Sequence, residues 1–157
     1  MIDILFDKII AWARARNADL VIGGKENPYL IRWHLIPINP IFNIYVHLFL
    51  RSDDDRALHD HPWGNCSIIM RGEYTEHRIL QGGINTRTDN KSGDWRIRWS
   101  GKYAHRVELK NGPCWTLFLT GPKYRTWGFH CPERGWVHWR LFTASDDPGA
   151  IGKGCSA

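Results

Sequence analysis

The sequence predicts an all-β domain of antiparallel strands with one α-helix at its N-terminal end. Apolar residues recur at intervals of three and four from Ile2 to Ala13, which is the spacing of one helix face. From Tyr29 onward, short runs rich in β-branched and aromatic residues alternate with turn residues, as strands and their connections do. A chain of 157 residues can bury a hydrophobic core, and we expect a single domain over residues 1–157.

The expected elements follow in order. A helix covers residues 1 to 17 of an N-terminal segment, residues 1–22, which Gly23-Gly24 ends. Strands are expected over residues 30–36, 44–51, 58–61, 66–70, 74–80, 95–100, 105–109, 115–120 and 135–142. The polar stretch 81–94 is expected to be a loop with a short hairpin. Asn111-Gly112 predicts a hairpin between the runs on either side of it. Residues 145–157 are expected to form a flexible tail.

Composition and charge restrict the class of protein. The formal net charge of +5 is spread along the chain without a compact basic run, so we expect no nucleic-acid partner. No apolar run approaches the roughly 20 residues that span a bilayer, so no membrane segment is expected. We see no secretion leader, and we expect a cytoplasmic protein with reduced thiols at its four cysteines, Cys66, Cys114, Cys131 and Cys155. A homodimer through edge strands is the expected assembly.

The candidate metal ligands are His59, His61 and His105. Side chains on a strand alternate between faces, so His59 and His61 project from one face and Asp60 from the other. Two imidazoles on one face can bind a divalent metal, and His105 from a neighbouring strand is the best candidate for a third ligand. The alternative is a set of structural histidines in a polar barrel mouth. Iron, nickel, manganese and zinc all suit such a site.

These residues also carry a family resemblance. The string His59-Asp60-His61 with Cys66, the closing Gly72, and the later His105-Arg106-Val107-Glu108 resemble the cupin superfamily, and within it the cysteine dioxygenase type. The chain also looks like small bacterial and phage cupin-like proteins. The resemblance implies a double-stranded β-helix, the cupin jelly roll, following the N-terminal helix. It also implies three histidines holding ferrous iron, with Cys66 standing beside the site where a typical cupin has a glutamate.

Cys66 has three readings: a fourth ligand, a redox thiol near the site, or a small buried apolar residue. The apolar run beside it favours the last of these. Glu76 could support the metal ligands or act as a general acid or base, but a solvated strand face is the favoured place for Glu73, Glu76 and His77. His47 is expected to be a hydrogen-bonded core histidine rather than a residue of the pocket.

Substrate-binding roles are assigned to three further residues. Arg51 and Arg56 could anchor a carboxylate or phosphate, since a guanidinium matches such groups in a bidentate way. The alternative is a surface ion pair with the acidic turn 53–55. Trp63 is expected to wall the pocket and exclude water. Arg32 resembles Arg51 and Arg56, and its neighbours Trp33 and His34 suggest a strand that faces something specific.

His130, Cys131 and His138, with Cys155, form a second candidate metal cluster, although their spacing matches no established zinc pattern. Three functions follow from these observations. The first is an Fe(II) dioxygenase acting on a small polar or thiol substrate, as the resemblance implies. The second is a binding or assembly module without catalysis. The third is a metal-free epimerase with His61 as base and a tyrosine such as Tyr74 as acid.

Overall fold

The computed structural model describes residues 2–24, 26–53, 57–80, 83–147 and 149–156. The described residues are mainly antiparallel β-strands, with the helix α1 (Ile2–Arg14) at the N-terminal end. The all-β class with an N-terminal helix is therefore confirmed. In the described part of the chain, no helix is long and apolar enough to cross a membrane.

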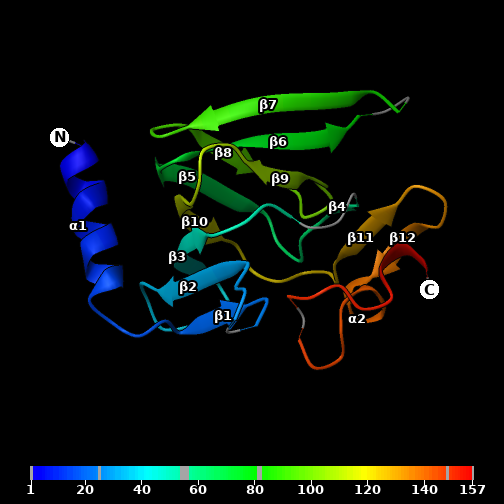
Figure 1. The fold of residues 1–157 in the computed structure, drawn as a ribbon, viewed down its shortest axis with the longest axis horizontal. Helices are drawn as coiled ribbons and strands as arrows, with labels where there is room; N and C mark the ends of the chain where they lie inside the picture. The colour runs from blue at the N-terminus through cyan, green and yellow to red at the C-terminus, as the bar shows by residue number, and fades with distance from the viewer. Residues whose placement is uncertain (1, 25, 54–56, 81–82, 148, 157) are drawn as a thin grey trace.

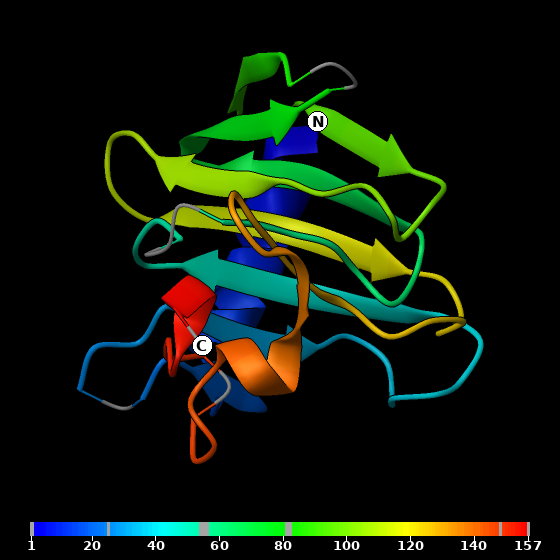
Figure 2. The ribbon, with the colours of Figure 1, turned by 90° about the vertical axis from the view of Figure 1, so that its right-hand side faces the viewer.

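The larger sheet has six strands in the order β1-β2-β3-β10-β5-β8, all paired antiparallel. The members in that order are β1 (Leu20–Ile22), β2 (Leu30–His34), β3 (Asn43–Phe49), β10 (Cys114–Thr120), β5 (Asn65–Arg71) and β8 (Trp95–Arg98). Figure 2 shows these strands running across the view, with α1 behind them and the C-terminal segment in front.

Two three-stranded sheets complete the scaffold. One contains β7 (Asn85–Lys91), β6 (Glu73–Ile79) and β9 (Arg106–Leu109), and the other contains β12 (Gly135–His138), β11 (Gly128–Cys131) and β4 (Leu58–His59). An antiparallel bridge between His59 and His105 links the β4 edge of one sheet to the segment that leads into β9 of the other. The residues expected to bind metal therefore lie where these two sheets meet.

The helix α1 packs on the outer face of the larger sheet. Its buried residues Phe6, Ile10 and Ala13 join a core cluster with Trp33 and Trp115, whose rings stack at 5.5 Å. Figure 1 shows α1 at the opposite end of the molecule from the C-terminal helix α2 (Trp139–Phe142). The outer apolar face of the sheet is thus covered by α1, and the inner face is left for a cavity.

The N-terminal helix is shorter than expected. It ends at Arg14, and residues 20–22 of the segment expected to be helical form β1. Beyond the helix, the backbone N–H of Asp19 donates to Arg32 O at 3.0 Å and its carboxylate accepts from His34 N at 2.8 Å. These bonds hold the chain that leads into β1 beside β2.

Other expectations about elements are corrected. Residues 85–91 form the strand β7 instead of a loop with a short hairpin, and β11 was not expected. The last expected strand, 135–142, ends at His138 and continues as α2. Asn111-Gly112 does turn, with Gly112 at φ +99°, but the hairpin prediction is wrong. Strand β9 pairs with β6, whereas β10 pairs with β3 and β5.

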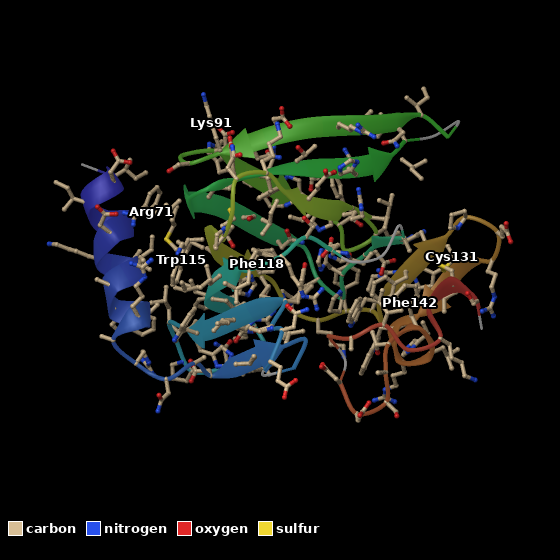
Figure 3. All side chains as sticks on the ribbon, in the orientation of Figure 1. Arg71, Lys91, Trp115, Phe118, Cys131 and Phe142 are labelled. Carbon is tan, nitrogen blue, oxygen red and sulfur yellow. A yellow bond between two sulfur atoms is a disulfide. The ribbon has the colours of Figure 1, made fainter. Side chains whose placement is uncertain are left out.

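The C-terminal segment is fastened to the sheet of β11. Cys131, labelled in Figure 3, forms a disulfide with Cys155, so the expectation of reduced thiols is wrong for this pair. Cys66 and Cys114 are free. A bridge joins Thr143 to Ile151, and residues 154–156 form a short 3₁₀ helix. Described residues of the stretch expected to be a flexible tail therefore carry a covalent crosslink and backbone pairing.

Candidate metal centre

Backbone pairing brings the three expected ligands together. His59 and His105 exchange two backbone hydrogen bonds, of 2.9 and 3.0 Å, and His61 N donates to Gly101 O at 2.9 Å. The segment before β9 is thereby held against the segment that follows β4. His105, which lies 44 residues beyond His61 in the sequence, becomes its neighbour in space.

The three imidazoles converge on one point. One ring nitrogen from each of His59, His61 and His105 lies within 4.8 Å of the others, and the Nε2 atoms of His61 and His105 are 2.9 Å apart. Two nitrogens bound at about 2.1 Å to one metal and at right angles would lie about 3 Å apart. The donor set and its spacing therefore fit one divalent metal, with the metal's identity left open among those that imidazole suits.

Glu76 fixes the orientation of His105. The Nδ1 of His105 lies 2.6 Å from Oε1 of Glu76, a buried carboxylate that also pairs with the buried guanidinium of Arg98. Burial alone would raise the pKa of Glu76, but the hydrogen bond from His105 and the charges of His105 and Arg98 lower it to about 2. The ionised carboxylate accepts the Nδ1 proton of His105, and Nε2 is left as the metal-binding atom.

The expectation that Glu76 and His77 lie on a solvated face is therefore wrong, since both are buried. Their strand, β6, is paired on both edges, by β7 and by β9, so neither of its edges is open to water. Strand alternation could have placed Glu76, because residues two apart on a strand share a face and Tyr74 lines the cavity.

Burial keeps the other two imidazoles neutral. It lowers the pKa of His59 to about 4, an effect that Asp53 partly opposes with a carboxylate oxygen 3.6 Å from Nδ1. Burial and the neighbouring imidazoles of His105 and His59 lower the pKa of His61 well below its usual value. Neutral imidazoles present the lone pairs that a metal needs.

Asp60 points away from the site, as the alternation predicts. It is 1% exposed, and its carboxylate accepts from the backbone N–H of Gly128, the guanidinium of Arg125 and the indole N–H of Trp136. His130 Nε2 lies 3.2 Å from the same carboxylate. Asp60 thus ties the segment that carries both adjacent ligands to the hairpin of β11 and β12.

The three histidines open into a cavity of about 800 Å³ that all three sheets line. Trp63 lines it as expected, with its ring 5.1 Å from that of His61. Arg51 also lines it, and its Nε donates to Asn27 O at 3.4 Å. Arg56 lies outside the described residues. The C-terminal segment contributes part of the wall through Phe142 and residues 149–151.

Three basic side chains that line the cavity were not placed there by the sequence. His47 lines the cavity, so its assignment to the core away from the pocket is corrected. Its Nε2 accepts a 2.8 Å hydrogen bond from Nε of Arg32, which also lines the cavity. Arg98 is a third lining residue, and its role beside Glu76 had no signal in the local sequence.

Cys66 is placed differently from the resemblance. On β5 the residue that lines the cavity is Ser67, so strand alternation puts Cys66 on the opposite face of the sheet. Burial raises the pKa of the Cys66 thiol, which disfavours the reactive thiolate. This placement argues against a fourth ligand, while Cys66 is only partly buried rather than a fully buried apolar residue.

The second candidate metal cluster is not formed. Cys131 is bonded to Cys155, and the Nε2 of His138 lies 2.8 Å from the Thr126 hydroxyl. His130 contacts Asp60, as described above. Within the described ranges, His59, His61 and His105 are the one group of three or more potential ligands close enough to share a metal.

No protein-family model matches the sequence, and no curated protein is similar to it. Solved structures are similar in fold. The DMSP lyase DddQ from Ruegeria pomeroyi superposes with a TM-score of 0.54 at 21% identity, over 81% of this chain and 67% of that one. Fe(II) HppE in complex with substrate superposes with a TM-score of 0.52 at 13% identity, over 68% of this chain. That match spans 57% of HppE. Oxalate decarboxylase from Bacillus subtilis, with its Mn(II) centres, gives a TM-score of 0.51 at 13% identity, over 74% of this chain and 30% of that one.

Proposed function

The chain has the cupin fold, and from that premise we propose that it is a metal-dependent cupin enzyme, an Fe(II) dioxygenase that acts on a small molecule in its cavity. The observation that carries this proposal is the convergence of His59, His61 and His105 within 4.8 Å at the wall of the cavity. Structural metal sites are usually closed by four protein ligands, whereas catalytic sites keep a position open. Three imidazoles facing a cavity belong to the second kind.

Iron is the metal that we propose, with nickel, manganese and zinc as alternatives. Two structural neighbours are described with Fe(II) and Mn(II), and the histidine strings resemble those of ferrous cupins. When bound, the metal would supply Lewis acidity and open positions for oxygen and substrate. Because the three ligands are neutral, the site would keep the positive charge of the metal and favour an anionic substrate group, a thiolate among them.

The protein's own residues would do the remaining work. Glu76 holds the proton at Nδ1 of His105 and keeps Nε2 available. Trp63 and Phe118 cover His61, their ring centroids lying 5.1 and 6.2 Å from its own, and they exclude water from that side. Arg51 lines the same cavity and could meet a substrate anion.

The test uses full-length protein purified without an affinity tag. Elemental analysis is expected to give about one equivalent of metal per chain, and the His105→Ala variant is expected to lose it. His138→Ala removes a histidine outside the site and serves as the matched control. Iron-loaded protein is then exposed to nitric oxide under anaerobic conditions, and an electron paramagnetic resonance signal from an iron–nitrosyl species would report an open position.

The outcomes separate the proposal from its main rival. Bound metal with a nitrosyl signal supports an open, catalytic type of site. Bound metal without such a signal favours a structural metal in a binding module. Folded protein without metal, and without loss of stability on replacing the three histidines, would contradict metal-dependent function altogether.

A further inference from the structure

Arg32 is a partly buried cation for which the described part of the chain supplies no carboxylate counter-ion. It lies on β2, opposite His47 on β3, and both residues line the cavity. Among the described residues, the buried guanidinium of Arg98 pairs with Glu76, whereas that of Arg32 forms no ion pair with a carboxylate. Burial lowers the pKa of Arg32, as expected of a desolvated charge without a neutralising partner.

The contacts that Arg32 does make hold the guanidinium in place without neutralising it. Its Nε donates to Nε2 of His47 at 2.8 Å, and its guanidinium carbon lies 4.6 Å from the centroid of the Tyr45 ring. Burial and the charge of Arg32 lower the pKa of His47 well below its usual value, so this imidazole is a neutral acceptor. A guanidinium has five N–H donors, and the fork of its two terminal nitrogens is the part that binds carboxylates in a bidentate way.

The lining of the cavity is mostly apolar, although Asp53, Asp146 and Asp147 also lie on it, and the cavity is larger than a small polar substrate needs. Its aromatic lining consists of Tyr29, Phe49, Trp63, Tyr74, Phe118, Trp127, Phe129 and Phe142. A substrate of a few heavy atoms would leave much of the 800 Å³ to water against these apolar walls, which is unfavourable. The lining therefore fits a ligand whose body is itself apolar.

Phe118 connects the two ends of such a ligand site. Its ring stacks on His47 with 5.1 Å between centroids, and its centroid lies 6.2 Å from that of His61. Phe118 lies near the centre of the molecule in Figure 3. A ligand anchored at Arg32 and packed along Phe118 would therefore extend toward the imidazole cluster.

We propose that the cavity binds an organic anion with an apolar body, and that Arg32, braced by His47, holds the anionic group while Phe118 and its neighbours pack on the body. This inference rests on the proposed function, since it names the class of substrate for the same cavity. It replaces the small polar or thiol substrate implied by the resemblance with a larger aromatic or aliphatic carboxylate.

The test is calorimetric titration of the full chain with three probes: 3-phenylpropionate, its uncharged amide 3-phenylpropionamide, and acetate. The acid is expected to bind at least about 10-fold more tightly than the amide, because only the acid pairs with the guanidinium, and more tightly than acetate, which has no apolar body. Arg32→Gln is expected to weaken binding of the acid roughly 10- to 100-fold and to abolish the preference over the amide. Arg87→Gln removes an equal charge from the exposed face of β7 and is expected to change neither.

The proposal is overturned if acid and amide bind equally to the unaltered protein, if acetate binds as tightly as the acid, or if folded Arg32→Gln keeps the preference. Circular dichroism checks the fold of each variant, and the comparison of the three probes on unaltered protein decides the matter if Arg32→Gln does not fold. Each titration is made with metal-free and metal-loaded protein. Preference for the acid without metal binding would retain this inference and contradict the proposed function. An open metal site with no preference for the acid would retain the proposed function and contradict this inference.

Discussion

The Oε1 atom of Glu76 lies 2.6 Å from Nδ1 of His105, and the two residues come from segments 29 positions apart. This contact places the imidazole proton of His105 on Nδ1 and leaves the lone pair on Nε2. The Nε2 atom of His61 lies 2.9 Å from that atom. The same carboxylate neutralises Arg98, so one buried group serves both the metal centre and the core. A metal ligand of this kind depends on the carboxylate behind it for its orientation and basicity.

Replacing Glu76 is expected to weaken metal binding without removing a ligand. In Glu76→Gln the negative charge that orients His105 is lost, and metal affinity should fall about 10- to 100-fold. Competition with a chromophoric chelator measures the change. Glu108→Gln is the matched control, because Glu108 also contacts a histidine, His77, at 2.6 Å but is half exposed. Equal affinities for Glu76→Gln and the unaltered protein would show that this carboxylate has no part in the site.

The pH dependence of stability should reflect His47. Its pKa is lowered in the folded protein by burial and by Arg32, so between the usual value of 6.5 and the folded pKa the unfolded chain binds more protons. Stability should therefore fall as the pH drops below 6.5, by about 1.4 kcal/mol per pH unit for this one group. Urea unfolding of metal-free protein measures the slope.

In the variant His47→Gln the amide oxygen can still accept from Arg32, but the titrating group is gone. The dependence of its unfolding free energy on pH should therefore be smaller by the contribution of His47. Identical slopes for variant and parent between about pH 6.5 and pH 5 would mean that His47 titrates alike in the folded and unfolded states.

The disulfide should stabilise the wall of the cavity. It joins Cys131 to Cys155, which are 24 residues apart in the sequence. A crosslink that closes a loop of that size adds about 3 kcal/mol to the free energy of unfolding. Reduction, or Cys155→Ser, should lower stability by that amount and make residues 139–156 more sensitive to protease. Cys66→Ser leaves the crosslink intact and is the control. Under denaturing, non-reducing conditions the chain should show two reactive thiols, those of Cys66 and Cys114; four would contradict the crosslink.

Asp60 should matter more for stability than its short side chain suggests. It is 1% exposed and accepts hydrogen bonds from Gly128, Arg125 and Trp136. Replacing it with alanine would leave these donors without their acceptor, and roughly 3 kcal/mol of unfolding free energy should be lost. Asp89→Ala, which removes a carboxylate that is 68% exposed, should cost far less in the same denaturant titration. Similar losses for the two variants would refute the role given to Asp60.

The sequence was most informative where a local period decides the geometry. Alternation along 59–61 correctly placed two imidazoles on one face and Asp60 on the other, and the spacing of Ile2 to Ala13 predicted the helix. Pairing between distant segments could not be read in this way. Nothing near Glu76 signals that β6 lies between β7 and β9, or that Arg98 reaches its carboxylate. The same limit hid the contact between Arg32 and His47, and it led to a wrong hairpin at Asn111-Gly112, where the local turn is real but the strands join different partners.

The disulfide was missed for a related reason. Cys131 and Cys155 share no short spacing motif, and the polar composition after Ser145 is typical of a loose end. Only the fold shows that β11 and the C-terminal residues lie side by side and can be crosslinked.

The central claim is that three imidazoles share one metal, and the most direct measurement is the anomalous diffraction of crystals of the full chain loaded with Fe(II) or Co(II). We expect one strong anomalous peak within bonding distance, about 2.0–2.2 Å, of a ring nitrogen from each of His59, His61 and His105. A peak elsewhere, or no peak in crystals whose three rings keep the present arrangement, would contradict it.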